Sequence, residues 1–96
     1  MEVEVKEKSN TELEVRVKGE TYTLIVPIAE KLSEFDEVVF AGYDVPHPLV
    51  EEGVIYLRVR EGSDPLSLLR KATEMVIKEF EELESSFKEE LSNLKR

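Results

Sequence analysis

The longest regular pattern in the sequence is PLSLLRKATEMVIKEFEELESSFKEELSNL, residues 65–94. Ser63 or Asp64 can cap a helix here, and Pro65 suits the first helical position, where no N–H is needed. Apolar residues then recur every three or four positions, which is the period of one helix face. They are Leu66, Leu69, Val76, Phe80, Leu83, Phe87, Leu91 and Leu94, with Thr73 in the gap. The pattern therefore predicts one long C-terminal helix.

This helix is longer than the rest of the chain is wide. At 1.5 Å per residue it measures about 45 Å, whereas a compact domain of 96 residues is roughly 30 Å across. We expect the helix to cover its own sheet as far as Phe80 and Leu83 and then to project. Phe87, Leu91 and Leu94 would remain uncovered, and a row of exposed large apolar side chains marks a protein interface.

Toward the N-terminus the apolar period changes from about 3.6 to 2. Residues 3–5 and 13–17 alternate valine or leucine with charged residues, which is typical of strands with one buried face. Lys-Ser-Asn-Thr over 8–11 is turn material, so these two strands should form an antiparallel hairpin. Gly19 ends the second strand.

Two further strands are predicted in the middle of the chain. Residues 38–43 are apolar and rich in β-branched side chains, which favours a buried strand. The prolines at 46 and 48 remove two sheet donors and end it. Residues 54–60 form the next strand, which Gly62 closes.

The stretch over 22–35 permits two structures. Pro27 is tolerated in the first turn of a helix and not in its interior, so we favour a short helix over about 26–34. The alternation of Tyr22 and Leu24 leaves a strand over 21–25 open. Apolar residues at steps of four, four and three form one face of such a helix: Leu24, Ile28, Leu32 and Phe35.

The element order is β-β-α-β-β-α, which predicts an α+β fold. We expect a four-stranded, mainly antiparallel sheet with both helices on one face. With 96 residues and no linker or repeat, residues 1–96 should form a single domain.

Charge and composition exclude several classes of function. Against 22 acidic residues stand 13 basic ones, a net charge of −9, so direct binding to nucleic acid is disfavoured. The longest apolar run, 24–29, is too short for a membrane span, and the N-terminus has no signal-peptide pattern, so we expect a cytoplasmic protein. The absence of Cys and Gln, together with abundant Glu and Lys, favours a thermophilic source.

No group of residues suggests catalysis or a cofactor. His47 is the single histidine and there is no cysteine, so a metal site lacks converging nitrogen or sulfur ligands. Ser85 and Ser86 have no neighbouring base. Neither phosphate-binding glycine loops nor hydrolase motifs occur. We therefore expect no catalytic residue, no metal and no cofactor, and the chain by itself should not be an enzyme.

A resemblance to a known family rests on two segments. FAGYDVPHPL over 40–49 is a strand ending in a small residue and Tyr43, followed by a step into His-Pro-Leu. GETYTL over 19–24 is similar to a Gly-Glu-Asp-His-Thr-Leu box, matching it at Gly19, Glu20, Thr23 and Leu24. With the long helix downstream, the chain resembles subunit L of archaeal DNA-directed RNA polymerase over nearly its whole length. It departs from the family at residues 25–27, Ile-Val-Pro.

The resemblance implies an assembly role without catalysis. Family members pair with a larger RNA polymerase protein, the D subunit, and the pair forms the platform on which the large catalytic subunits dock. The helix that opens at the Thr-Leu box contacts the D subunit in this family, and we expect Pro27 to shorten or shift it. The partner interface then comprises Leu24, Ile28, Leu32, Phe35, Phe87, Leu91 and Leu94.

An alternative of a different class remains open. The chain can be a stand-alone α+β module that associates with a second copy through its long helix. The two hypotheses differ in the segment 25–35, whose apolar face must be exposed for pairing with the D subunit, whereas self-association can use the long helix alone.

Overall fold

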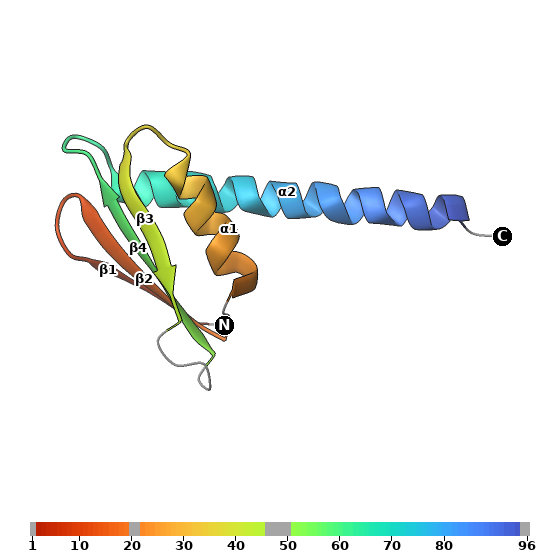
Figure 1. The fold of residues 1–96 in the computed structure, drawn as a ribbon, viewed down its shortest axis with the longest axis horizontal. Helices are drawn as coiled ribbons and strands as arrows, with labels where there is room; N and C mark the ends of the chain where they lie inside the picture. The colour runs from red at the N-terminus through yellow and green to blue at the C-terminus, as the bar shows by residue number, and fades with distance from the viewer. Residues whose placement is uncertain (1, 20–21, 46–50, 95–96) are drawn as a thin grey trace.

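The computed structural model describes residues 2–19, 22–45 and 51–94 (Figure 1). Four strands and two helices follow one another in the predicted order, which confirms the α+β arrangement. Their bounds are β1 (Glu2–Glu7), β2 (Glu12–Lys18), α1 (Tyr22–Ser33), β3 (Val38–Asp44), β4 (Glu52–Val59) and α2 (Pro65–Leu94). The long helix has the predicted bounds, and Gly62 occupies the turn before it with a φ of +89°, a conformation that favours glycine.

All four strands form one sheet in the order β1-β2-β4-β3, and every neighbouring pair is antiparallel. Leu13 lies opposite Leu57, and Val15 lies opposite Ile55. Residues directly opposite each other in an antiparallel pair point to the same face. The apolar side chains of β2 and β4 therefore share one face of the sheet.

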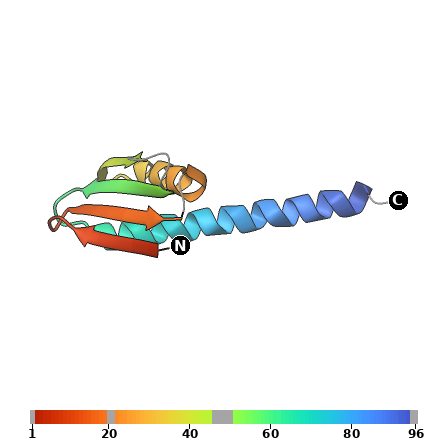
Figure 2. The same cartoon turned by 90° about the horizontal axis from the view of Figure 1, so that it is seen from below.

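Both helices pack against this apolar face (Figures 1 and 2). Helix α1 lies over β3 and β4, and the beginning of α2 contacts α1, β2 and β4. Side chains from these elements form one core, in which burial of apolar area supplies most of the stabilisation. The core comprises Leu13, Val15, Ile25, Leu32, Ile55, Leu57, Val59, Leu68 and Ala72.

Helix α1 starts four residues earlier than the predicted position at about 26, at Tyr22, with Pro27 inside it. The predicted start was wrong, as was the alternative strand over 21–25. Burial explains the difference, because Ile25 lies in the core and reaches it from a helix that begins before it. Pro27 is only the sixth residue of α1, so its missing N–H removes one hydrogen bond near the first turn. Pro27 therefore does not shorten α1.

Strand β3 is not the buried strand that its composition predicts. It is the last strand of the sheet and pairs only with β4. A register shift lies between Val38 and Phe40, and the side chains of Val39 and Phe40 are exposed. Apolar content in a short strand does not reveal whether the strand lies at the centre or at the edge of a sheet.

Strand β1 is the opposite edge, and its valines also differ from the prediction. Val3 and Val5 pair with Val17 and Val15, so they point to the helix side of the sheet, yet both are exposed. Within the described ranges, neither helix contacts β1. Of the predicted hairpin, β2 alone has a buried face, because the two helices cover only three of the four strands.

None of the helices within the described ranges is long and apolar enough to cross a membrane.

Candidate partner interface

Only the first part of α2 belongs to the core. Its buried residues are Pro65, Leu68, Ala72 and Val76, and no residue from 77 to 94 is buried. Phe80, 39% exposed, and Leu83 were predicted to cover the sheet, but both are exposed. The last buried residue of α2 is Val76, so the helix leaves the body about two turns earlier than predicted, because α1 crosses α2 steeply and covers a short length of it (Figure 1).

The projecting half of α2 carries a continuous row of exposed apolar side chains, which we call the overhang stripe. It continues, at steps of three and four residues, the buried face of Leu68, Ala72 and Val76. Its residues range from 39% exposed at Phe80 to 65% at Leu91. The overhang stripe comprises Phe80, Leu83, Phe87, Leu91 and Leu94. One helix face therefore serves the core in its first half and is open in its second.

The projecting helix gives the molecule an extended shape. Its extents are 57 × 34 × 17 Å and its radius of gyration is 15.8 Å, against about 12.5 Å for a compact domain of this length. Large apolar side chains left in water over such a distance are typical of protein interaction sites.

The predicted phase of the stripe was wrong in the first half of α2. Leu66 is exposed and Leu69 only partly buried, whereas Leu68 and Ala72 are in the core. Leucines at both 66 and 68 make the apolar face wide, so periodicity alone does not select its centre. The small side chain of Ala72, fully buried, marks where α2 meets the core.

Helix α1 and the turn that follows it add a second apolar area. Ile28 and Phe35 are partly buried and pack against the core, and Leu24 is also partly exposed. Leu32, by contrast, is 0% exposed. We correct the sequence prediction here, because Leu32 is on the inward side of α1 and offers no surface to a partner. The candidate interface then consists of Leu24, Ile28, Phe35 and the overhang stripe.

Two cations link α2 to α1 and to the turn after α1: Lys31 near the point where α2 leaves the body, and Lys71 in the second turn of α2. The Nζ atom of Lys31 in α1 lies 2.6 Å from a carboxylate oxygen of Glu79 in α2 and 3.7 Å from one of Glu34. The hydrogen bond to Glu79 raises the pKa of Lys31 above its ordinary value. Lys71 Nζ lies 5.4 Å from the ring centre of Phe35, within cation–π range.

The Lys31 link predicts a specific pH dependence. A raised pKa means that the stabilising contribution of Lys31 is fully present below the ordinary lysine pKa, about 10.4, and is lost as the pH rises above it. The free energy of unfolding, measured with urea, should therefore be slightly higher for the wild type than for Lys31→Met, and this difference should stay the same from pH 6 to 9. The difference between them should then shrink as the pH rises through the raised pKa of Lys31. The exposed Lys78→Met variant serves as the control; a difference that grows with pH would contradict the link.

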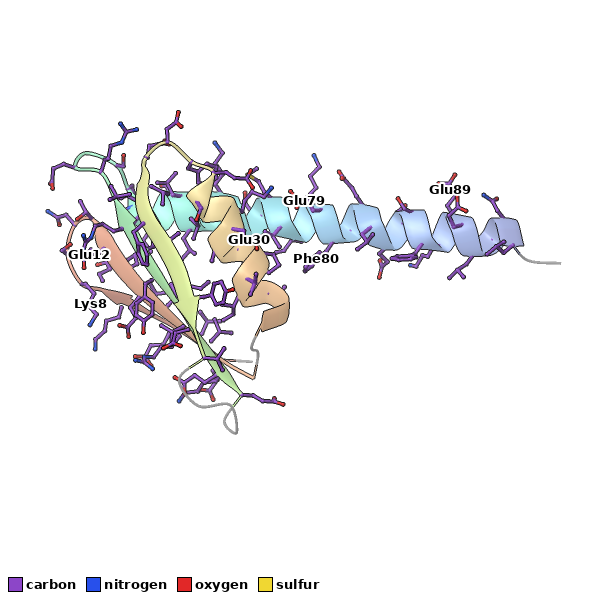
Figure 3. All side chains as sticks on the ribbon, viewed as in Figure 1. Lys8, Glu12, Glu30, Glu79, Phe80 and Glu89 are labelled. Carbon is purple, nitrogen blue, oxygen red and sulfur yellow. The ribbon has the colours of Figure 1, made fainter. Side chains whose placement is uncertain are left out.

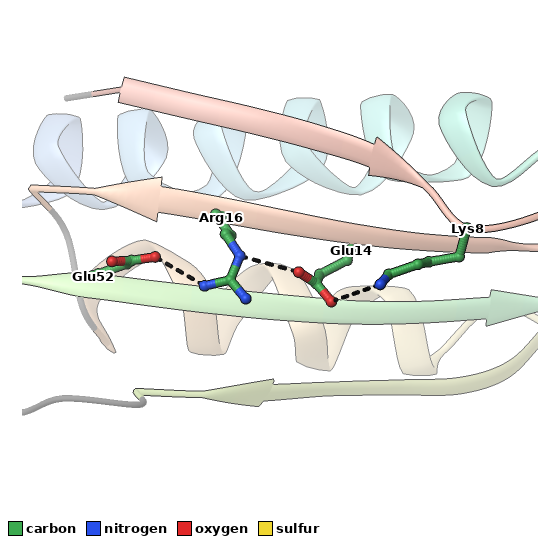
Figure 4. Close-up of polar contacts among 4 residues, drawn as sticks. All are labelled: Lys8, Glu14, Arg16 and Glu52. Atoms are coloured by element: carbon green, nitrogen blue, oxygen red, sulfur yellow. Dashed lines mark hydrogen bonds and ion pairs between the residues drawn. The ribbon is translucent and has the colours of Figure 1, made fainter.

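The other face of the sheet is more polar, although Phe40, Tyr56 and Val54 also point to it. Lys8, Glu14, Arg16 and Glu52 form a row of ion pairs across it, with N···O distances of 3.6, 3.0 and 3.0 Å (Figure 4). The Glu52 carboxylate accepts a hydrogen bond from Arg16 and raises the pKa of its guanidinium. Because these charges are already paired with one another, this face is a weaker candidate for an apolar interface than the helix side.

A hollow of about 360 Å³ lies beside this row, and Phe40, Tyr56 and Arg58 contribute to its walls. The adjoining carboxylates are held by cations, as Glu12 is by Arg58 at 3.0 Å. Among residues 2–19, 22–45 and 51–94, no three Asp, Glu or His side chains come together as a metal site. His47 lies outside the described residues.

A comparison with protein families identifies the chain. Residues 12–86 match the RNA polymerase Rpb3/Rpb11 dimerisation domain. The chain belongs to this family. The match runs from β2 through α1 and ends within the projecting half of α2, so it includes Phe80 and Leu83 and stops one residue before Phe87.

Relatives from archaea match this chain over nearly its whole length, and a solved structure of one of them shares its fold. The chain is 50% identical over 95 residues to the DNA-directed RNA polymerase subunit Rpo11 of Korarchaeum cryptofilum, covering 99% of this chain and 97% of that one. Rpo11 of Pyrobaculum aerophilum is 37% identical over 87 residues, 91% and 94% of the two chains. The crystal structure of subunit L of DNA-directed RNA polymerase from Thermoplasma acidophilum superposes with a TM-score of 0.76 at 26% identity, covering 96% and 90%.

Membership of a dimerisation-domain family makes the exposed apolar residues of α2 candidates for contact with another protein chain. Sequence reasoning missed Phe80 and Leu83 as surface residues, together with Ile77, which is exposed beside the overhang stripe. The only signal that could have found them was the helix length, and it placed the departure point of α2 about two turns too late. Phe87, Leu91 and Leu94 are exposed, as their position on the projecting helix predicts.

Proposed function

We propose that this chain is the small assembly subunit, subunit L, of an archaeal DNA-directed RNA polymerase. It pairs with the D subunit through α1 and α2, and through that partner it supports the large subunits that hold the active site. It contributes no catalytic residue, metal or cofactor. The proposal includes a single domain over 1–96 that works in the cytoplasm with the polymerase.

The overhang stripe is the observation that carries this proposal. Five large apolar side chains stand along one face of α2 and are exposed in the chain alone. In a family defined by a dimerisation domain, a stripe of this kind supports a helix-to-helix interface. The names of the archaeal relatives supply the enzyme to which such a pair would belong.

The partly exposed side chains of α1 extend the same interface. Leu24 and Ile28 lie on α1, which crosses α2 near its departure point (Figure 1), and Phe35 lies in the turn two residues after α1 ends. A partner that covers both α1 and the overhang stripe would bury a larger apolar area than α2 offers by itself, and it would be oriented by the crossing of the two helices. Lys31 of α1 contacts Glu79 of α2, and Lys71 of α2 contacts Phe35 in the turn after α1, so both contacts support this arrangement.

Co-expression with the D subunit of the same organism tests the proposal. We expect a stable 1:1 complex on size exclusion, because the stripe and α1 become covered. The Leu91→Glu variant should abolish this complex, since it puts a charge into the stripe. The matched Ser85→Glu variant, on the opposite side of α2, should leave the complex intact.

Two results would argue against the proposal. One is a chain that ignores the D subunit and forms a stable dimer with itself, which would favour the self-associating module. The other is a complex with the D subunit that Leu91→Glu and Ser85→Glu weaken equally, which would move the interface away from the stripe. Affinity purification from the native cell adds an independent check, because the large polymerase subunits should be recovered.

A further inference from the structure

The projecting half of α2 is acidic as well as amphipathic. Residues 77–94 contain six glutamates and two lysines, a net charge of −4. Glu79 is neutralised by Lys31 at 2.6 Å, and Glu84 lies 3.7 Å from Lys88. Within the described part of the chain, the remaining four glutamates form no ion pair, and all of them are exposed. They are Glu81, Glu82, Glu89 and Glu90.

The glutamates differ in their position relative to the overhang stripe. At 100° per residue, Glu84 and Glu90 lie about 60° to either side of the middle of the stripe. Glu82 and Glu89 lie about 140–160° from it, on the far side of the helix. Figure 3 shows Phe80 and Glu89 on opposite sides of α2. Glu84 and Glu90 therefore border any helix that docks on the stripe, and the exposed 3.7 Å contact of Glu84 with Lys88 is weak enough for a docking cation to replace. Glu82 and Glu89 stay in solvent.

We propose that these acidic flanks select the partner of the overhang stripe: an amphipathic helix whose apolar face is bordered by Lys or Arg. The inference rests on the proposed function and adds the chemistry by which the partner is recognised. The apolar stripe supplies contact area, and the flanking charges decide which apolar helix is accepted.

The same charges oppose a second copy of this chain as the occupant. Two copies would bring two segments of net charge −4 together, on chains of net charge −9 each. Like charges at the border of an interface are repulsive, and burial of the apolar stripe lowers the screening by water between them. A basic partner turns the same glutamates into attractive neighbours. The stripe alone would permit either occupant, and its border distinguishes them.

A charge-reversal experiment tests this directly. The variant Glu84→Lys/Glu90→Lys reverses the border, and Glu82→Lys/Glu89→Lys makes the same change of net charge on the far side. At 50 mM NaCl we expect the border variant to bind the D subunit at least tenfold more weakly than the wild type. The far-side variant should stay within about threefold. The difference in affinity for the D subunit between the two variants should be smaller at 500 mM NaCl, because salt screens exposed charges.

Equal binding by the two variants would overturn the inference and leave the proposed function standing. If the wild type does not bind the D subunit at all, the proposed function fails. The inference is then tested on a mixture of the wild type and the border variant. The border variant is itself a stripe with basic flanks, so an equimolar mixture with the wild type should form a 1:1 pair in sedimentation velocity. A mixture that stays monomeric, or a wild type that pairs with itself as readily, would then overturn it.

Discussion

Replacing Leu32 by alanine is expected to lower the free energy of unfolding by about 2–5 kcal/mol. Leu32 is 0% exposed, on the inward side of α1, and is a member of the core. The truncation removes apolar contacts and leaves a cavity that the surrounding core closes only in part. Against a total stability of about 5–15 kcal/mol for a domain of ordinary stability, this is a large loss for a single residue of α1.

The same chemical change at Leu83 serves as the control. Leu83 is exposed on the overhang stripe and lies outside the core, so Leu83→Ala should change the free energy of unfolding by less than about 1 kcal/mol. Urea unfolding of the dilute single chain, followed by circular dichroism, compares the two. Equal losses would mean that the helix folds back on the body in solution and that the stripe is covered.

The second large effect concerns association. Phe87 is 61% exposed near the middle of the overhang stripe, so Phe87→Ala should leave unfolding of the dilute chain nearly unchanged. It should weaken partner binding by about 2 kcal/mol or more, roughly 30-fold, as truncation of a central interface aromatic does. Calorimetric titration with the D subunit measures the binding, or sedimentation equilibrium if the chain associates with itself.

Phe40 offers a matched control for this variant. It is similarly exposed, but it points to the polar face of the sheet, away from both helices. Phe40→Ala therefore removes the same side chain without touching the proposed interface. Partner binding that falls equally in the two variants would place the polar face of the sheet in the interface and remove the stripe from its centre.

The bounds of α2 and the existence of the hairpin were predictable because local signals determine them. Pro65 marks the helix start, and an apolar period of 3.6 or 2 depends only on neighbours along the chain. The order of the strands is not local. Residues 38–43 look like a central strand, yet β3 is an edge, because β4 inserts between β2 and β3. A single sequence carries no direct signal for that choice.

The start of α1 shows how tertiary packing overrides a local rule. Pro27 argues against a helix over 22–26 on propensity alone. Burial of Ile25 in the core outweighs the one hydrogen bond that the proline removes. A local rule gives the cost of Pro27 correctly. It does not include the apolar area that the core buries when those four additional residues are helical.

The candidate interface was predictable in kind but not in extent. The length of α2, compared with the width of a compact domain, indicated that the helix projects. Phe87, Leu91 and Leu94 are exposed, as a projecting helix requires. The assignments of Leu32 to the surface and of Phe80 to the sheet were wrong for one reason. Both depend on the angle at which α1 crosses α2, and this angle is set by packing between segments distant in sequence.

The short contact between α2 and the body has a consequence for the dynamics of the chain. Residues 77–94 have almost no support beyond their own helical hydrogen bonds and the ion pairs of Glu79 and Glu84. Most helix stability in proteins comes from tertiary packing, so this segment should open locally more readily than the packed first half of α2. Its helix–coil equilibrium is therefore coupled to assembly: a partner that covers the stripe shifts the equilibrium toward helix, and the ordering entropy reduces the net affinity.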